Sequence, residues 1–579
     1  MKFARITVIS VFSIISVIIL WSLNKGFDFT DEGFCLLGYQ NNQEIGASPS
    51  YFYIIVRKIF GVFELNIINV RIIRFLLTVF SSLVFSTGLW AWINSITKNN
   101  KNKFHFIYIF LFVTIGSFAS YTLLTQSLSY NNLNAFFQLL STGFFLYALS
   151  KFSIKNQEIF ILILIIITGI LLAFVVFIKL TSSIPQLLLF SFIILIYPSS
   201  IKVFKRIYLS FFLLLGFFLG LIIYFNFFQS FSDFYNGFTE SKYFLSSLGY
   251  NFLSMLNNIK VSIRIIIEIC IFSVFWFFIY FFIKKINKNY FHIKIIRFLI
   301  VISYFIFAFL FIYFIINPPF TEYSRIFLLP LIFLILYFLF EFTFYNRKQF
   351  TLYYDKQSNI FICLLLLLLQ PFIGALGSNN GIIINSIFGI TFWFAIIIIL
   401  INFFNYNYKF SIGIIISTSL ISLYLIIHSL VLNPYRTSCL LKQKYNIPEI
   451  KNAKYFKFDL ETKNYIQQVN NILINNNFKH GDPIIGIYRM PGLIYLVGGV
   501  SPGGILWSDP LHKLYCYNLD NSNMCISNSY ILLKDKYPTE FIEELNKLGI
   551  VFPDEFKKIG EVNKKNIPVK IYKPINYRE

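Results

Sequence analysis

Long apolar runs are the feature that most constrains the fold of this chain. Runs such as residues 6–23 and 159–178 match the roughly 20 apolar residues that a helix needs to cross a bilayer. With 57% hydrophobic and only 13% charged residues, the chain is too apolar for a soluble globular protein. We therefore expect a polytopic α-helical membrane protein. Its predicted spans number about thirteen and lie at residues 6–23, 73–95, 105–124, 132–150, 159–178, 181–198, 207–228, 263–283, 297–316, 326–345, 359–376, 382–404 and 410–432.

The first run indicates how the chain enters the membrane. Lys2 and Arg5 precede residues 6–23, and no small-residue cleavage pattern follows that run. We expect an uncleaved signal anchor with the N-terminus in the cytoplasm.

Basic residues gather in alternate short connections between the predicted spans. They cluster at residues 98–103, 151–155, 202–206, 284–297 and 347–356, whereas residues 120–133 and 376–383 contain no lysine or arginine. The positive-inside rule assigns the basic connections to the cytoplasm. The formal charge of +23 therefore indicates topology, and no nucleic-acid partner is expected. An odd number of spans then places the C-terminus on the outer side of the membrane.

The composition changes at residue 433, which divides a membrane domain, residues 1–432, from a C-terminal segment, residues 433–579. That segment has apolar runs of only a few residues, which favours a small extracytoplasmic α/β domain with its own core. Helices are predicted at residues 465–474 and 538–550, and strands at 482–488, 493–499 and 569–573. Two outer loops, residues 24–72 and 229–262, interrupt the membrane domain. The first contains amphipathic stretches that predict helices lying on the bilayer.

Four of the six cysteines fall on the predicted outer side: Cys35, Cys439, Cys516 and Cys525. Disulfides persist in such a compartment. Cys516 and Cys525 are the closest two in sequence. They either form a disulfide or remain two free thiols, and the sequence leaves both alternatives open.

Three acids gather directly after the first span, in the stretch FDFTDEGF. They are Asp28, Asp31 and Glu32. One interpretation is local: Thr30 caps a helix whose first turn carries the acids. The other is catalytic. A carboxylate near a cationic cluster suits an enzyme with a lipid-linked phosphate donor, because the base deprotonates an acceptor while the cations hold the leaving group.

Four cations lie at the same predicted depth. Arg57 and Lys58 belong to the first outer loop, and Lys179 and Arg325 lie at outer ends of apolar runs. A lysine at a span end often only extends its amine to the surface, and Arg325 has a nearby acid, Glu322, for a surface ion pair. Their shared side favours a role in binding phosphate.

Two amide-rich stretches face the same side, residues 129–137 and 374–381. Their side chains either contact a sugar or cap and connect helices. Both interpretations stay open.

Taken together, these segments resemble the GT-C superfamily of polytopic glycosyltransferases, in particular the family 39-like group of protein mannosyltransferases and the lipid A aminoarabinose transferase. The resemblance rests on TDEG after span one, RIIRFL leading into span two, the lysine in GILLAFVVFIKLTSSIP, and EYSRIFLLPLIFLIL opening a late span. A C-terminal outer domain containing YLVGGVSPGGILW adds to it. After TDEG the sequence departs from the aminoarabinose-transferase pattern, since GFCLLGYQNN replaces an Arg-Tyr continuation and no Lys-Pro-Pro motif follows.

The resemblance implies transfer of a sugar from a polyprenyl-phosphate carrier to a cell-envelope acceptor, a glycolipid, polysaccharide or protein, on the outer face of the membrane. Asp31 then matches the catalytic acid and Glu32 its neighbour. Candidates for the donor phosphate are Arg57, Lys58, Lys179 and Arg325. No obligatory metal is expected, although Asp28 with Asp31 leaves a divalent cation open.

Two rival functions use related substrates. A transporter or flippase for lipid-linked saccharides is expected to carry ionisable residues near the bilayer midplane and repeated halves. A polysaccharide polymerase or ligase typically has its large outer loop between spans. The charges at span ends and the C-terminal position of the largest outer segment favour the transferase.

Overall fold

The computed structural model describes residues 2–40, 50–97, 104–152, 157–198, 202–247, 252–286, 323–344, 354–378, 381–403, 408–487, 489–503 and 519–575, the last range without 521, 523, 525, 535–538 and 565–566. The predicted span 297–316, together with Glu322, Cys516 and Cys525, lies outside these residues.

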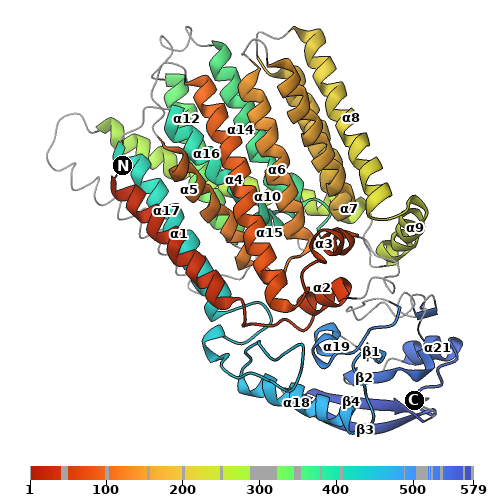
Figure 1. Ribbon diagram of the computed structural model, residues 1–579. Helices are drawn as coiled ribbons and strands as arrows, with labels where there is room; N and C mark the ends of the chain where they lie inside the picture. Colours follow the sequence, from red (N-terminus) through yellow and green to blue (C-terminus); the bar gives the residue numbers. More distant parts are fainter. Residues whose placement is uncertain are drawn as a thin grey trace.

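Most of the described chain is a bundle of long helices with a small domain at one end (Figure 1). Within the described residues, eight helices are long and apolar enough to cross a membrane, so the protein is a multi-pass membrane protein. The helices before the small domain are α1 (Lys2–Ser22), α2 (Asp31–Gln40), α3 (Phe52–Phe60), α4 (Ile67–Ile96), α5 (Phe106–Phe118), η1 (Ala119–Thr122), α6 (Tyr130–Lys151), α7 (Glu158–Ile196), α8 (Val203–Phe227), α9 (Phe231–Ser247), α10 (Phe252–Ile286), α12 (Tyr323–Phe344), α14 (Tyr354–Ala375), α15 (Ile382–Asn385), η4 (Ser386–Gly389), α16 (Ile390–Phe403), α17 (Tyr408–Ile426) and η5 (Ile427–Leu432).

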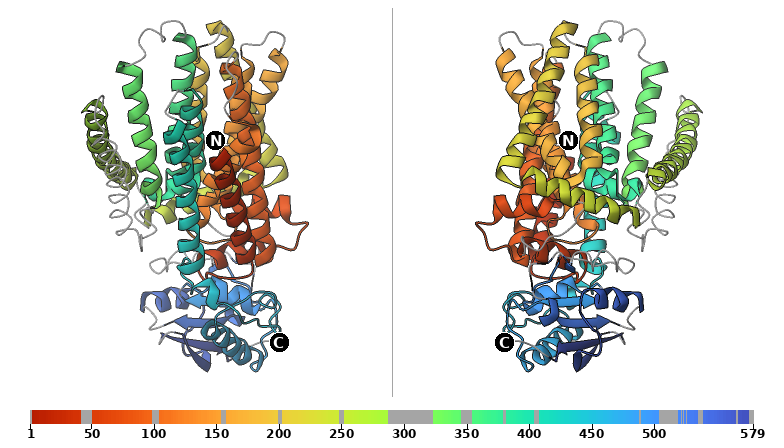
Figure 2. Two further views of the ribbon diagram at one scale, coloured as in Figure 1. Left: turned by 90° about the vertical axis from the view of Figure 1, so that its left-hand side faces the viewer. Right: turned by 90° about the vertical axis from the view of Figure 1, so that its right-hand side faces the viewer.

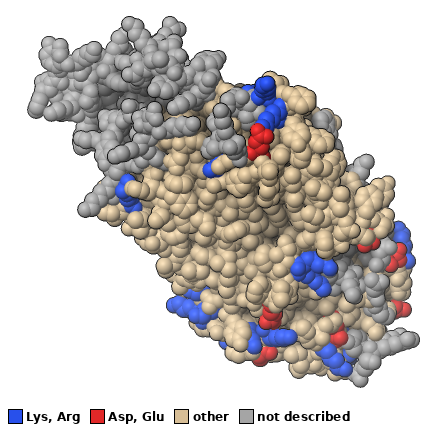
Figure 3. Space-filling model, turned by 45° about the horizontal axis from the view of Figure 1, so that its top comes forward, with Lys and Arg blue, Asp and Glu red and all other residues tan. Residues whose placement is uncertain are grey.

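The surface of the bundle agrees with a membrane environment. A broad band without charged side chains separates the charged groups at the upper and lower parts of the face in Figure 3. Glycines bring the packed helices close together. A Cβ atom added to Gly88 of α4 would lie 2.0 Å from the carbonyl oxygen of Gly143 of α6, so only glycine allows this backbone contact.

Element α7 covers two predicted spans, 159–178 and 181–198, because the chain turns back at Lys179. The backbone there is non-helical, with φ −158° and ψ 84°. The Ser183 hydroxyl donates to the Leu172 carbonyl at 2.7 Å, whereas a straight helix would separate residues 11 positions apart by about 16 Å. Glu158 and Lys205 form an ion pair at the opposite end of the bundle. The two arms therefore run antiparallel, and Lys179 lies in the turn between them.

Three helices lie outside the long bundle. The first outer loop forms α2 and α3, which lie between the bundle and the small domain (Figure 1). Its predicted amphipathic part, residues 50–75, corresponds to α3 and the start of α4. Helix α9 crosses the direction of the long helices (Figure 2). The ring of Tyr51, directly before α3, packs against the ring of Phe234 of α9 at a tilt of 55°, with centroids 5.4 Å apart. These helices thus surround the end of the bundle at which α1 ends.

The small domain contains a four-stranded mixed sheet with the order β1-β2-β4-β3. Strand β1 pairs with β2 in parallel, and the other two pairs are antiparallel. The elements are η6 (Leu440–Lys442), α18 (Leu460–Ile474), β1 (Ile484–Ile487), α19 (Pro491–Val497), η7 (Ile526–Asn528), β2 (Tyr530–Lys534), α21 (Thr539–Lys547), β3 (Phe556–Lys564) and β4 (Ile567–Pro574). The expected small α/β domain is therefore present.

One predicted strand of this domain is wrong. Residues 493–497 belong to α19, which begins with Pro491 and ends at Val497, and Gly498 directly after it has the left-handed conformation, with φ 82°. Proline at the first position and glycine just after the last are helix signals. Apolar and polar residues do not alternate in LIYLV, residues 493–497, so the strand was predicted only because the apolar run is short. The other predicted helices and strands correspond to α18, α21, β1 and β4.

Candidate functional site

Asp28 organises the start of α2. Its carboxylate accepts hydrogen bonds from the backbone N–H groups of Thr30 and Asp31, at 3.0 and 2.9 Å, and from the Thr30 hydroxyl at 2.7 Å. The helix is therefore capped by Asp28 and not by Thr30, because the Asp28 carboxylate reaches two N–H groups at the helix start. Burial, together with the charge of Asp31, raises the pKa of Asp28 to about 6.

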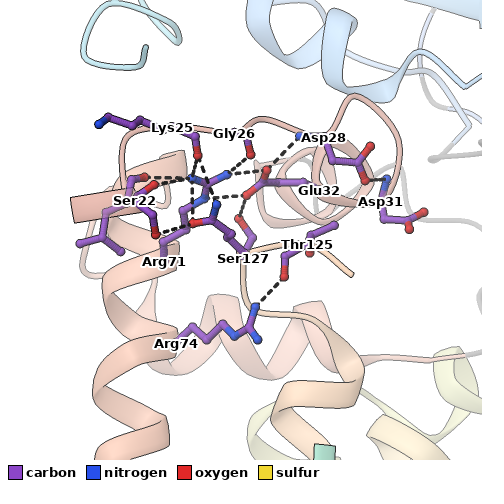
Figure 4. Close-up of polar contacts among 12 residues, drawn as sticks. Ser22, Lys25, Gly26, Asp28, Asp31, Glu32, Arg71, Arg74, Thr125 and Ser127 are labelled. Carbon is purple, nitrogen blue, oxygen red and sulfur yellow. Dashed lines mark hydrogen bonds and ion pairs between the residues drawn. The ribbon is translucent and has the colours of Figure 1, made fainter. Parts of the chain in front are cut away.

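Glu32 forms a buried ion pair with Arg71 of α4 (Figure 4). Nε of Arg71 donates to Oε1 of Glu32 at 2.8 Å, and Nη2 donates to Oε2 at 2.7 Å. Both side chains are 0% exposed. The Ser127 hydroxyl and the Asp28 backbone N–H also donate to this carboxylate. Its oxygens are therefore fully engaged within the protein.

The same arginine holds the end of the first span. Arg71 also donates to the backbone carbonyls of Ser22, Leu23, Lys25 and Gly26. One turn further along α4, Arg74 donates to the carbonyls of Thr125 and Ser120 (Figure 4). The two arginines thus bind the chain around residues 22–26 and the connection around residues 120–127 to one helix. Both arginines of the RIIRFL motif, Arg71 and Arg74, therefore hold neighbouring segments of the chain in place.

Asp31 faces the opposite direction, toward the C-terminal domain. Its side chain is 24% exposed, and Oδ1 lies 3.3 Å from Nη1 of Arg436. Tyr435 also donates a hydrogen bond to this carboxylate, and the charge of Arg489 acts on it. Burial raises the pKa of Asp31, and Arg436 opposes that rise most strongly. Both carboxylates therefore lie beside an arginine, but Asp31 is partly accessible and Glu32 is fully buried.

Gly33 completes the motif by docking the C-terminal domain onto α2. A Cβ atom added to Gly33 would lie 2.1 Å from the backbone nitrogen of Gly492, in the first turn of α19. The Gly492 N–H donates to the Phe29 carbonyl at 2.8 Å. Each residue from Asp31 to Gly33 thus has a separate contact: with the end of the last span, with α4, and with the C-terminal domain.

A cavity of about 410 Å³ lies beside this motif, between the bundle and the chain that leaves it. Tyr435 and Thr437 belong to its wall, and Arg436 lies between them in sequence. Across the cavity, His428 lies 3.4 Å from the Tyr323 hydroxyl through Nδ1. The described residues that line it are Gly26, Asp28, Tyr121, Thr122, Leu123, Leu124, Thr125, Gln126, Tyr323, His428, Ser429, Leu430, Asn433, Pro434, Tyr435 and Thr437.

Lys179 lies away from this cavity, and its amine is enclosed by hydrogen-bond acceptors. Its amine donates to the Gly374 carbonyl at 2.9 Å and to the Ser378 hydroxyl at 2.5 Å, and it lies 3.5 Å from Oδ1 of Asn131. Asn134 donates to the same Gly374 carbonyl. The lysine and the two amide-rich stretches therefore meet one another and join α6, α7 and α14. Asn131 and Asn134 of the first stretch thus have helix-connecting contacts, whereas Asn379 and Asn380 of the second lie outside the described residues.

The other predicted phosphate ligands are distributed around the bundle end. Arg57 and Lys58 occupy the last turn of α3, where Arg57 is half-buried and Lys58 exposed. No described contact joins either of them to Asp31 or Glu32. Arg325 is half-buried in the first turn of α12, two residues after Tyr323 of the cavity wall.

Two residues of the site were missed by the sequence analysis. His428 lies four residues before Leu432, where the final span ends, and Arg436 lies four residues after it. A single histidine and a single arginine carry no spacing pattern. Arg71 was visible in RIIRFL, and an arginine inside an apolar run is itself a signal for a buried partner.

Asp28 and Asp31 were considered above as ligands of a divalent cation. Among the described residues, no group of three or more His, Cys, Asp or Glu side chains could hold one. The Asp28 oxygens already accept three hydrogen bonds, and a divalent cation needs several free oxygen ligands. Asp28 and Asp31 alone therefore do not fit such a site.

No known protein family matches this sequence, and a search of curated proteins found none that matches it either.

Proposed function

We propose that this protein is a membrane glycosyltransferase that moves a sugar from a polyprenyl-phosphate donor to a cell-envelope acceptor on the outer face of the membrane. The observation that carries the proposal is the different environment of two adjacent carboxylates. Glu32 is enclosed and fully hydrogen-bonded, whereas Asp31 is 24% exposed beside Arg436 and next to a cavity. A base needs this kind of access.

In this proposal Asp31 takes the proton from an acceptor hydroxyl or amine. The freed electron pair attacks the anomeric carbon of the sugar, and the bond from that carbon to the phosphate oxygen breaks. Polyprenyl phosphate leaves with the bonding electrons. A raised pKa makes the Asp31 carboxylate a stronger proton acceptor than an ordinary aspartate.

A cation must neutralise the phosphate that leaves. Arg436 is the best-placed guanidinium, because it is 35% exposed and lies within 3.3 Å of Asp31. Arg325, near the cavity wall, is a further candidate. Lys179 is engaged with a carbonyl and a hydroxyl, and Arg57 and Lys58 lie on α3. These three remain further candidates for the same phosphate.

Glu32 acts through position. Its pair with Arg71 ties the first turn of α2 to the end of α1, which fixes the direction in which Asp31 points. The protein is proposed to lie in a bacterial inner membrane with the C-terminal domain outside. A reporter enzyme that is active only outside the cytoplasm, fused after Glu579, should be active; an inactive fusion would contradict this orientation.

The test uses purified protein and a panel of polyprenyl-phosphate sugars. Asp31→Asn should lower the transfer rate by about 10²–10⁴-fold, the usual contribution of a general base. Asp233→Asn is the matched control, because Asp233 is an exposed aspartate on α9. A folded Asp31→Asn variant that transfers sugar at the wild-type rate would overturn the assignment of the base. A wild-type protein that moves intact donor lipid across a vesicle membrane without transferring sugar would favour the flippase.

A further inference from the structure

The cavity beside Asp31 has walls of uncharged polar groups and aromatic rings. Its described lining contains one acid, Asp28, and no lysine or arginine. Arg74 lies behind the Tyr121 ring, at 3.9 Å from its centroid, and its amino groups donate to backbone carbonyls. Arg436, between the wall residues Tyr435 and Thr437 in sequence, contacts Asp31, and Arg71 donates to the Gly26 carbonyl within a buried ion pair with Glu32. The interior therefore offers hydrogen bonds without a positive charge to pair with an anion.

A rare backbone conformation brings polar side chains into this wall. The last span ends in the π-helix η5, Ile427–Leu432, and π-helical turns occur frequently at functional sites. His428 and Ser429 of this turn line the cavity. Nε2 of His428 lies 3.2 Å from Nδ2 of Asn433, and Nδ1 lies 3.4 Å from the Tyr323 hydroxyl. The imidazole is thus held in position between two groups that also line the cavity.

Another wall residue has hydrogen-bonding capacity that the described residues do not use. The hydroxyl oxygen of Thr437 is buried and has no hydrogen-bond partner among them. Buried polar atoms in native proteins are normally paired. A bound molecule with hydroxyl groups would supply that partner.

We propose that this cavity binds the sugar unit of the donor and selects an uncharged sugar over the corresponding uronic acid. This assignment rests on the proposed function. Sugar hydroxyls both donate and accept hydrogen bonds, so they match the Asn433 amide and the Tyr323 and Thr437 hydroxyls, and His428 holds the first two of these groups in place. The faces of the sugar ring suit the aromatic side chains of Tyr121 and Tyr323. The volume of about 410 Å³ lies within the range of small-molecule pockets.

The charge of the lining provides the selectivity. A uronate carboxylate would lose its water on entering the cavity, and no lysine or arginine of the described lining could pair with it. Asp28 adds repulsion wherever its carboxylate is ionised. An uncharged sugar of the same stereochemistry avoids both penalties.

The first experiment measures binding by the purified full chain, separately from transfer. The ligands are matched pairs of polyprenyl-phosphate sugars: glucose and glucuronate, galactose and galacturonate, mannose and mannuronate. At least one neutral member should bind ten or more times more tightly than its uronate. Equal affinity within every pair, tighter uronate binding, or no binding of any ligand would overturn the proposal.

Two variants then test the named residues. His428→Phe keeps a ring against Tyr424 and removes both nitrogens, and Thr437→Val removes only the hydroxyl. Each should weaken binding of the preferred neutral donor by about tenfold, the effect of one lost hydrogen bond. Thr437→Val loses its own hydroxyl, and His428→Phe releases Asn433 and Tyr323 from their positions. His105→Phe is the control, because His105 is exposed directly before α5 and does not line the cavity. Unchanged affinity in both His428→Phe and Thr437→Val would contradict the assignment.

The two proposals fail in different ways. Selective binding of a neutral donor without any transfer to an acceptor would refute the transferase and support the sugar cavity. Transfer that uses uronate donors as well as neutral ones would support the transferase and refute the selectivity.

Discussion

Asp31 and Glu32 are neighbours in sequence and lie in regions of opposite character. On the bundle side, Glu32 and Arg71 are both 0% exposed and form two hydrogen bonds with one another. On the domain side, Asp31 and Arg436 are 24% and 35% exposed and are joined by a single contact of 3.3 Å. The first turn of α2 therefore separates a carboxylate that holds structure from one that a substrate can reach.

Two side chains of the same chemical type, the carboxylates of Asp31 and Glu32, therefore have different roles in this motif. A buried ion pair is strongly destabilised when one partner is removed, because the remaining charge stays buried and unpaired. A partly exposed pair contributes little to stability, since water compensates each partner. Variants on the two sides of α2 should therefore differ in what they change.

The largest effect is expected from Glu32→Gln, which leaves the Arg71 guanidinium without its counter-charge in a buried site. The free energy of unfolding should fall by about 3–5 kcal/mol, measured by thermal or denaturant unfolding in detergent. Glu561→Gln is the control, because Glu561 is 36% exposed in its pair with Lys558 on β3 of the small domain, and it should leave stability nearly unchanged. Equal losses for the two variants would remove the distinction between the two kinds of pair.

Asp28 lies between the two regions, since it caps α2 and also lines the cavity. Its pKa is raised from 3.8 to about 6 in the folded protein. Between these values the folded state holds a proton that the unfolded chain has released, so lowering the pH through this window stabilises the fold. Above about pH 6 the ionised Asp28 opposes folding in full.

Asp28→Asn removes this titration. The wild-type protein should therefore gain stability relative to Asp28→Asn as the pH falls from about 6 to about 4, by up to about 1.4 kcal/mol for each pH unit. Unfolding curves of both proteins across this range measure the difference. Parallel curves would show that the pKa of Asp28 is not raised in the fold.

The contact between Gly33 and Gly492 joins the accessible side of α2 to the C-terminal domain. Gly33→Ala places a Cβ atom 2.1 Å from a backbone nitrogen, and such overpacking costs about 1–3 kcal/mol. Gly413→Ala is the control, because Gly413 lies in α17 with nothing within 4 Å of an added Cβ. Protease digestion should release the C-terminal domain faster in Gly33→Ala only. Equal digestion of both variants would contradict a docking role.

The membrane spans could be predicted from the sequence, because each depends only on the length of one apolar run. Each span is a run of apolar residues, and bilayer thickness alone sets that length, so α1, α4 and α8 were predicted. Strand β3 was not, because Phe556–Lys564 reads FKKIGEVNK without apolar alternation. It is an edge strand that pairs only with β4, and that pairing is a property of the folded domain.

The candidate site was predictable only where one short motif supplied it. Asp31 and Glu32 were recognised as a pair, but their opposite exposures depend on Arg71 and Arg436, which lie 39 and 405 residues away. His428 reaches the cavity through a π-helical turn, for which the sequence gives no pattern. Lys179 was expected among phosphate ligands, and the contacts that surround it come from three helices folded together.

The smallest change in stability, and the most specific change in activity, is expected from Arg436→Gln. Because the pair with Asp31 is partly exposed, the free energy of unfolding should change by less than about 1 kcal/mol. The charge of Arg436 lowers the pKa of Asp31 against the effect of burial. Its removal should therefore raise that pKa further, and the base should become protonated at a higher pH.

Measured as the transfer rate against pH, the acid limb of the Arg436→Gln profile should lie at higher pH than that of the wild type. Arg264→Gln, which breaks an exposed pair on α10, should leave the limb in place. A lower maximal rate in Arg436→Gln with an unmoved limb would mean that Arg436 acts on the donor phosphate alone and that another group is the base. A shifted limb would instead show that the titration of Asp31 controls the rate. Glu32 cannot play this part, because Arg71 and Ser127 enclose its carboxylate and no substrate can reach it.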